Sequence, residues 1–156
     1  MIHPRTKLDV GYRLSRSGLA VAYGFTNITY LGPIISNIHV GVGSKAIKIT
    51  YSNVASPQIE LRNSHGFEIC CHGKEICSTN ETLWNAALAS QIPEEQLAIL
   101  LTVPSECIDK TIDGLRYLWR ETPCLFKQAA IYNSLDSNIP AGPYIHFSLF
   151  FRRITP

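Results

Sequence analysis

The stretch Ala46-Ile-Lys-Ile-Thr-Tyr-Ser52 decides the fold class, because Ile47, Ile49 and Tyr51 alternate with polar residues. A period of two is typical of a strand with one buried face. Similar or more continuous apolar runs follow at Ile59/Leu61, Phe67/Ile69/Cys71, 96–103, Leu115/Tyr117/Trp119 and 144–151. Turn-rich segments separate them, at 41–44, 63–66 and 140–143. Residues 33–150 are therefore predicted to form a mainly β, antiparallel sandwich-like domain.

The chain upstream of Gly32-Pro33 has a different period. Residues 4–23 predict one amphipathic helix, in which Pro4 suits the first turn and Gly24 the position just past the end. Its stripe has helical spacing and consists of Leu8, Gly11, Tyr12, Ser15, Leu19 and Ala22. A single helix cannot bury such a stripe alone, so either the β domain or a domain upstream of the chain must cover it.

Composition excludes several classes of protein. The chain has 156 residues, of which 46% are hydrophobic and 17% charged, so it is not a disordered chain. A net charge of +2 gives no electrostatic case for a nucleic-acid partner. The longest clean apolar run, 97–101, is too short for a membrane span, which takes about 20 residues.

Five cysteines and two sequons, at Asn27 and Asn80, suggest an oxidising, secretory compartment. No signal peptide opens the chain, which is expected if its beginning is missing. Neighbouring strand residues point to opposite faces, so Cys70 and Cys71 should have different partners. We expect a short bridge to Cys77 and a long-range bridge to Cys107 or Cys124, with one thiol left over.

Few residues offer catalytic or metal chemistry. The cysteine and histidine spacing fits no common zinc pattern, so no metal is expected. No Gly-x-Ser-x-Gly occurs, and Ser44 falls in a glycine-rich hairpin turn. His3, directly before Pro4, fits the N-cap of the helix, where the dipole favours the neutral imidazole that a general base requires. It could equally be a frayed terminal residue.

The aromatic residues of the β domain allow two interpretations. Trp84, Tyr117 and Trp119 could form a sugar-stacking platform or belong to the core, and the core is the commoner outcome for aromatics at strand spacing. Tyr117 and Trp119 are expected to share a face with Leu115. Arg116 points to the opposite face, as a surface charge or as part of a domain interface.

Several ordered motifs resemble the C-terminal part of the sialate O-acetylesterase family, over residues 2–147. They are Ile2-His-Pro-Arg-Thr-Lys7, Gly11-Tyr-Arg-Leu14, Ala22-Tyr-Gly24, Leu31-Gly-Pro33, Phe67-Glu-Ile-Cys-Cys71, Leu115-Arg-Tyr-Leu-Trp119, Pro123-Cys124, Lys127-Gln128 and Pro140-Ala-Gly-Pro-Tyr144. The resemblance implies an α/β hydrolase domain of the Ser-Gly-Asn-His type joined to a β-sandwich-like domain. Residues 1–26 would be the closing helix of the hydrolase domain, and 33–150 the accessory domain.

The resemblance also implies an activity. The family removes O-acetyl esters from sialic acids, in lysosomes or secreted, without a metal or organic cofactor. His3 matches its catalytic histidine, the general base that activates a serine. The serine, the acidic partner and the oxyanion residues lie upstream in the family, so this chain alone is expected to be inactive. The family pattern also has a cysteine after Lys127-Gln128, where this chain has Ala129.

Two alternatives stay open at the level of sequence. A secreted, non-catalytic β-sandwich module that binds glycans would account for the tryptophans and the sequons. A decayed gene remnant would account for the missing catalytic groups.

Overall fold

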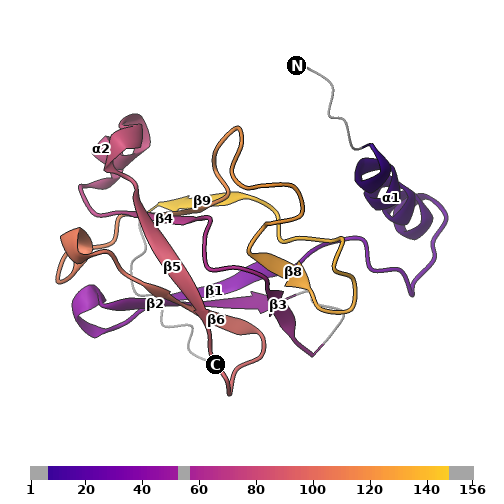
Figure 1. Ribbon diagram of the computed structural model, residues 1–156, viewed down its shortest axis with the longest axis horizontal. Coiled ribbons are helices and arrows are strands. Elements are labelled where there is room, and N and C mark those ends of the chain that lie inside the picture. Colours follow the sequence, from indigo (N-terminus) through magenta and orange to yellow (C-terminus); the bar gives the residue numbers. More distant parts are fainter. Residues whose placement is uncertain (1–6, 53–56, 148–156) are drawn as a thin grey trace.

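The protein is described by a computed structural model for residues 7–52 and 57–147, and within these ranges it is mainly β (Figure 1). Seven antiparallel strands form one sheet in the order β1-β2-β6-β5-β4-β7-β9. A further antiparallel pair, β3 and β8, lies beside it. The strands are β1 (Ile34–Val40), β2 (Ala46–Ser52), β3 (Ile59–Leu61), β4 (Phe67–Cys70), β5 (Asn85–Gln91), β6 (Ala98–Thr102), β7 (Gly114–Tyr117), β8 (Ile131–Asn133) and β9 (Tyr144–Phe147).

The sheet curls on itself through β5. The end of β5 from Leu88 onward pairs with β6, while its beginning, at 85–87, pairs with β4. The inner faces of the two halves then enclose the core, in which Ile47, Ile49 and Tyr51 of β2 are at most 2% exposed. The alternation of buried and half-buried residues along β2 confirms the period of two that the sequence shows.

Two disulfides fix the second half of the sheet. Cys70 pairs with Cys77 in the short helix α2 (Lys74–Thr79), and Cys71 pairs with Cys107. Cys71 and Cys107 belong to the main core, whereas Cys70 and Cys77 pack with Trp84 in a separate cluster. The opposite orientation of neighbouring cysteines is therefore confirmed, and Cys107 is the long-range partner. Within the described ranges Cys124 has a free thiol.

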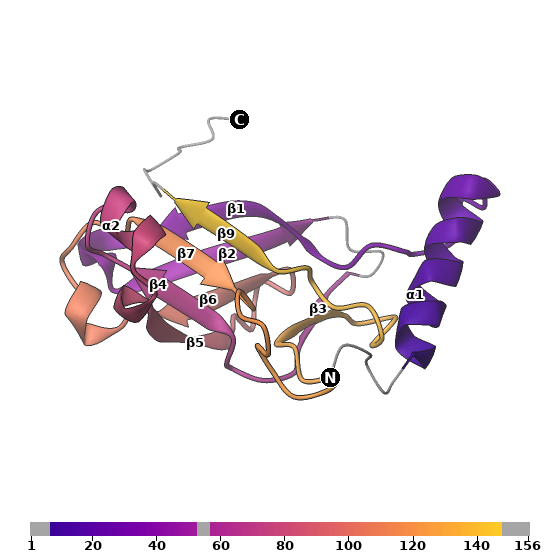
Figure 2. The same cartoon turned by 90° about the horizontal axis from the view of Figure 1, so that it is seen from above.

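The predicted helix is present from residue 8 onward, while residues 4–6 lie outside the described ranges. It consists of α1 (Leu8–Ser17) and a π-helical turn, Gly18–Ala22, and Gly24 follows with a φ of +73°. The helix stands at one end of the molecule, beyond β3 and β8 (Figure 2). Leu8 and Leu19 of the predicted stripe are 81% and 38% exposed, so the β domain leaves these apolar side chains uncovered. Among the described helices, none is long and apolar enough to span a membrane.

Candidate functional site

The helix α1 contacts the β domain with polar side chains. Asp9, Tyr12, Arg13 and Arg16 lie on one side of the helix, at the same i, i+3, i+4, i+7 spacing that an apolar stripe has. Arg13 Nε donates a hydrogen bond of 2.9 Å to the carbonyl oxygen of Asn138. This polar side was not recognised in the sequence, although its spacing is a signal that could have revealed it.

Asp136, in the loop after β8, is the centre of this contact. Its Oδ2 accepts a hydrogen bond of 2.6 Å from the Tyr12 hydroxyl and lies 3.5 Å from Arg16 Nε. The hydrogen bond to Asp136, together with burial, raises the pKa of Tyr12, so the phenol stays protonated as a donor. Arg16 Nε also donates to the carbonyl oxygen of Thr29, which ties the helix to the segment leading into β1.

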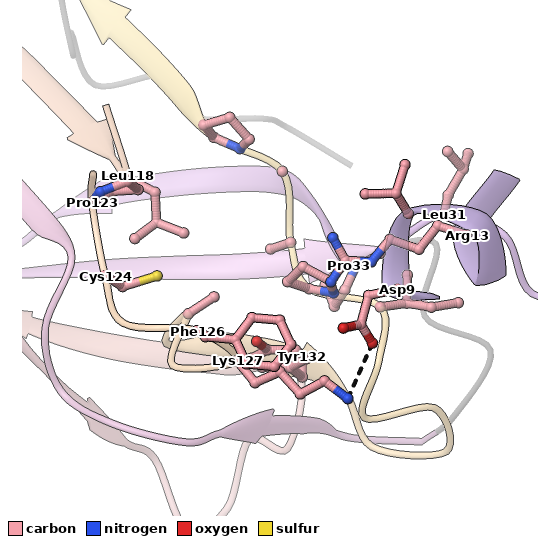
Figure 3. A pocket seen from close by; sticks show the side chains of 18 of the residues that line it. Asp9, Arg13, Leu31, Pro33, Leu118, Pro123, Cys124, Phe126, Lys127 and Tyr132 are labelled. Atoms are coloured by element: carbon pink, nitrogen blue, oxygen red, sulfur yellow. Dashed lines mark ion pairs between the residues drawn. The ribbon is translucent and has the colours of Figure 1, made fainter. Parts of the chain in front are cut away.

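A cavity of about 670 Å³ lies between α1 and the β domain (Figure 3). Asp9 and Lys127 form an ion pair across it, with 3.1 Å between Oδ1 and Nζ. The other labelled residues are mainly apolar: Leu31, Pro33, Leu118, Pro123, Cys124, Phe126 and Tyr132, with Arg13 at the helix. Such a lining suits the packing of an apolar group more than it suits acid–base chemistry.

The thiol of Cys124 lines this cavity but is not an activated nucleophile. Burial raises its pKa, which keeps the thiol protonated near neutral pH, and the thiolate is the reactive form. Ala129, which is 5% exposed, lines the same cavity. The replacement of a bridging cysteine by Ala129 stays a prediction.

The three aromatic residues considered as a sugar platform do not come together. Trp84 is 6% exposed and is covered by the guanidinium of Arg116, 4.4 Å from its ring centroid. Tyr117 is fully buried, and its hydroxyl accepts a hydrogen bond from the Ile131 amide. The expectation that Trp119 shares the face of Leu115 and Tyr117 is wrong, because β7 ends at Tyr117 and Leu118 adopts a φ of +50°.

Arg116 is buried, so its interpretation as a surface charge is wrong. Its side chain is 1% exposed and donates to Glu68, at 2.9 Å, and to Glu81, at 2.5 Å. Arg120 also donates to Glu68. Burial raises the pKa of the Glu68 carboxyl, but the hydrogen bonds from Arg120 and Arg116 lower it by more, so the net direction is down. The group is a structural ion cluster.

The remaining candidate residues are placed as follows. His3 lies outside the described ranges. Ser44 lies in the turn predicted for it, between β1 and β2, and its Oγ donates a hydrogen bond to the carbonyl oxygen of Lys110. Asn27 and Asn80 are both exposed. No cluster of metal-ligating side chains occurs among the described residues.

Comparisons with known proteins show which family the β domain is similar to. A family model described as the sialate O-acetylesterase C-terminal domain matches residues 36–148. The chain belongs to the sialate O-acetylesterase C-terminal domain family. Proteins named sialate O-acetylesterase from Rattus norvegicus and Homo sapiens are 34% and 32% identical to it, over 92% and 94% of this chain. The matches cover 24% and 26% of those proteins, so the chain spans about a quarter of their length.

A solved structure has the same fold. The crystal structure of a carbohydrate acetylesterase from Xanthomonas citri matches with a TM-score of 0.67 and 22% identity. The match covers 94% of this chain and 29% of that chain. At this identity the likeness shows the fold alone, and it confirms the mainly β class with the preceding helix.

Proposed function

We propose that this chain is the C-terminal portion of a sialate O-acetylesterase, an enzyme that hydrolyses O-acetyl esters of sialic acids by a serine–histidine mechanism. The observation that carries the proposal is the match of residues 36–148 to the C-terminal domain of that family. It is supported by identities above 30% to two proteins with this name over more than nine-tenths of the chain. The substrates are O-acetylated sialic acids or sialoglycans.

In this proposal residues 1–26 are the closing helix of a hydrolase domain, and residues 33–150 are its accessory domain. The exposure of α1 supports this division. Leu8, Leu14 and Val21 are 81%, 67% and 71% exposed, although full burial of such a side chain is worth about 1.5–3 kcal/mol. A hydrolase domain supplied from upstream would cover these exposed apolar side chains, while the polar side keeps its contacts with the β domain.

His3 is the proposed general base. The serine nucleophile, the acidic partner of the histidine and the oxyanion donors come from the hydrolase domain, and neither metal nor organic cofactor takes part. The isolated chain is therefore inactive. The protein is secreted or lysosomal. Two observations support this location: the two disulfides, which form in oxidising compartments, and the exposure of the sequon residues Asn27 and Asn80.

The proposal is tested with a chimera in which the matching region of the rat relative is exchanged for this chain. We expect the chimera to release acetate from O-acetylated sialic acid, and the isolated chain to release none. The Ser44→Ala chimera is the matched control and should keep full activity, because the Ser44 hydroxyl only bonds the Lys110 carbonyl. Turnover by the isolated chain that requires Ser44 would contradict the assignment.

A further inference from the structure

The contact between α1 and the loop after β8 has a consequence for the proposed active site. Asp136 is the one described side chain that contacts both Tyr12 and Arg16, through the same oxygen, Oδ2. It is only partly exposed, with 13% of its side chain accessible. The hydrogen bond from the Tyr12 hydroxyl to the carboxylate fixes direction as well as distance, because charge-assisted hydrogen bonds are short and directional, and the guanidinium of Arg16 adds an ion-pair contact at 3.5 Å.

Asp136 is itself held by its own loop. Its Oδ1 accepts a hydrogen bond of 3.1 Å from the Asn138 amide, and the Asp136 amide lies 3.4 Å from the Asn133 side-chain oxygen at the end of β8. The Asn138 carbonyl in turn accepts from Arg13. The carboxylate of Asp136 therefore links the helix α1 to the end of β8.

The position of the helix matters because His3 precedes α1 by five residues of sequence. With a rise of about 1.5 Å per residue, Tyr12 lies about 6 Å along the axis from Leu8, so a tilt of about 10° at Tyr12 moves the start of α1 by about 1 Å. A displacement of about 1 Å at a catalytic group can cost about 100-fold in rate.

We propose that Asp136 is a positioning residue for the esterase: by holding Tyr12 and Arg16 it sets the orientation of α1, the helix that follows His3 in the sequence. The inference rests on the proposed function for the role of His3, whereas the orientation of the helix can be measured without it. The β domain then acts in catalysis through this contact, without touching the substrate.

The test uses variants on both sides of the contact. Tyr12→Phe removes the hydroxyl donor and leaves the loop intact, while Asp136→Ala removes the acceptor. Asp136→Asn keeps an oxygen that can accept from Tyr12 and is the conservative variant. Ser15→Ala is the matched control, because Ser15 lies on the exposed side of the same helix and its hydroxyl bonds only the Tyr12 carbonyl.

Residual dipolar couplings measured on the whole isolated chain report the orientation of α1 relative to the sheet. We expect one common alignment for α1 and the sheet in the parent chain and in Ser15→Ala, and separate alignments in Tyr12→Phe and Asp136→Ala, with Asp136→Asn in between. In the chimera, kcat should fall about 10- to 100-fold in the two disruptive variants while KM stays within about 2-fold.

The outcomes separate the two proposals. An inactive parent chimera would contradict the proposed function, and the dipolar couplings would still decide whether Asp136 orients the helix. Unchanged couplings in both disruptive variants would overturn the positioning role. So would an altered orientation accompanied by an unchanged kcat in an active chimera.

Discussion

Replacing Arg116 by Met should destabilise the β domain strongly. The guanidinium is 1% exposed, pairs with Glu68 at 2.9 Å and covers the Trp84 ring at 4.4 Å. The Glu68 side chain is only 10% exposed, so the substitution leaves a buried carboxylate with one arginine fewer. Breaking a buried ion pair from one side costs about 3–5 kcal/mol of unfolding free energy.

Urea unfolding with the disulfides intact measures this cost, provided that the m-value does not change. Arg120→Met is the matched control, since the Arg120 side chain is 61% exposed and should contribute at most about 1 kcal/mol. The double variant Arg116→Met with Glu68→Met should be much less destabilised than the sum of the single variants, because no buried charge is left unpaired.

The pH dependence of the free energy of unfolding gives a further check on the role of Glu68. The pKa of Glu68 is lowered in the folded protein from its ordinary value near 4.5, so its contribution to stability is complete above that value and is lost as the pH falls through the folded pKa. In Arg116→Met the remaining burial opposes the charge, and protonation relieves the cost. The difference between parent and variant should therefore be largest at neutral pH and shrink below about pH 4. A cost below about 1 kcal/mol, or strict additivity in the double variant, would refute this reasoning.

Three further substitutions have clear expected outcomes. Tyr51→Phe should leave the free energy of unfolding within about 0.5 kcal/mol of the parent value, because the buried Tyr51 hydroxyl has no hydrogen-bond partner of normal geometry among the described residues. Tyr117→Phe should cost about 1 kcal/mol, because it loses the hydrogen bond that the Ile131 amide donates to the hydroxyl. Chemical denaturation of both variants side by side checks this, and equal costs would contradict it. Ala129→Cys should form a disulfide with Cys124, so that thiol titration of the unfolded, oxidised chain falls from one free sulfhydryl to none; two free sulfhydryls would show that Ala129 does not occupy the position of a bridging cysteine.

The sequence predicts six of the nine described strands, β2, β3, β4, β6, β7 and β9, for a physical reason, whereas β1, β5 and β8 were missed. The burial of Ile47 and Ile49 depends on a single pleated segment and its period, which is a local property. The separate partners of Cys70 and Cys71 follow from the same geometry.

Properties that depend on a second element could not be predicted. Periodicity places Arg116 on the outer face of its strand, but Trp84 and Glu81 lie against its guanidinium and bury it. Likewise, the stripe of α1 predicts an apolar contact, whereas the β domain presents Asp136 to the helix. The side of a helix that packs against a domain depends on the surface of that domain, so the sequence pattern of the helix alone does not predict it.

The role of His3 is the central claim, and chemical rescue tests it most directly. In the chimera, His3→Ala should lower kcat by at least about 10³-fold with KM nearly unchanged, because a general base acts only in the transition state. Added imidazole should restore part of the lost rate, with a pH dependence that follows the free imidazole. Full activity of the His3→Ala chimera would contradict the account.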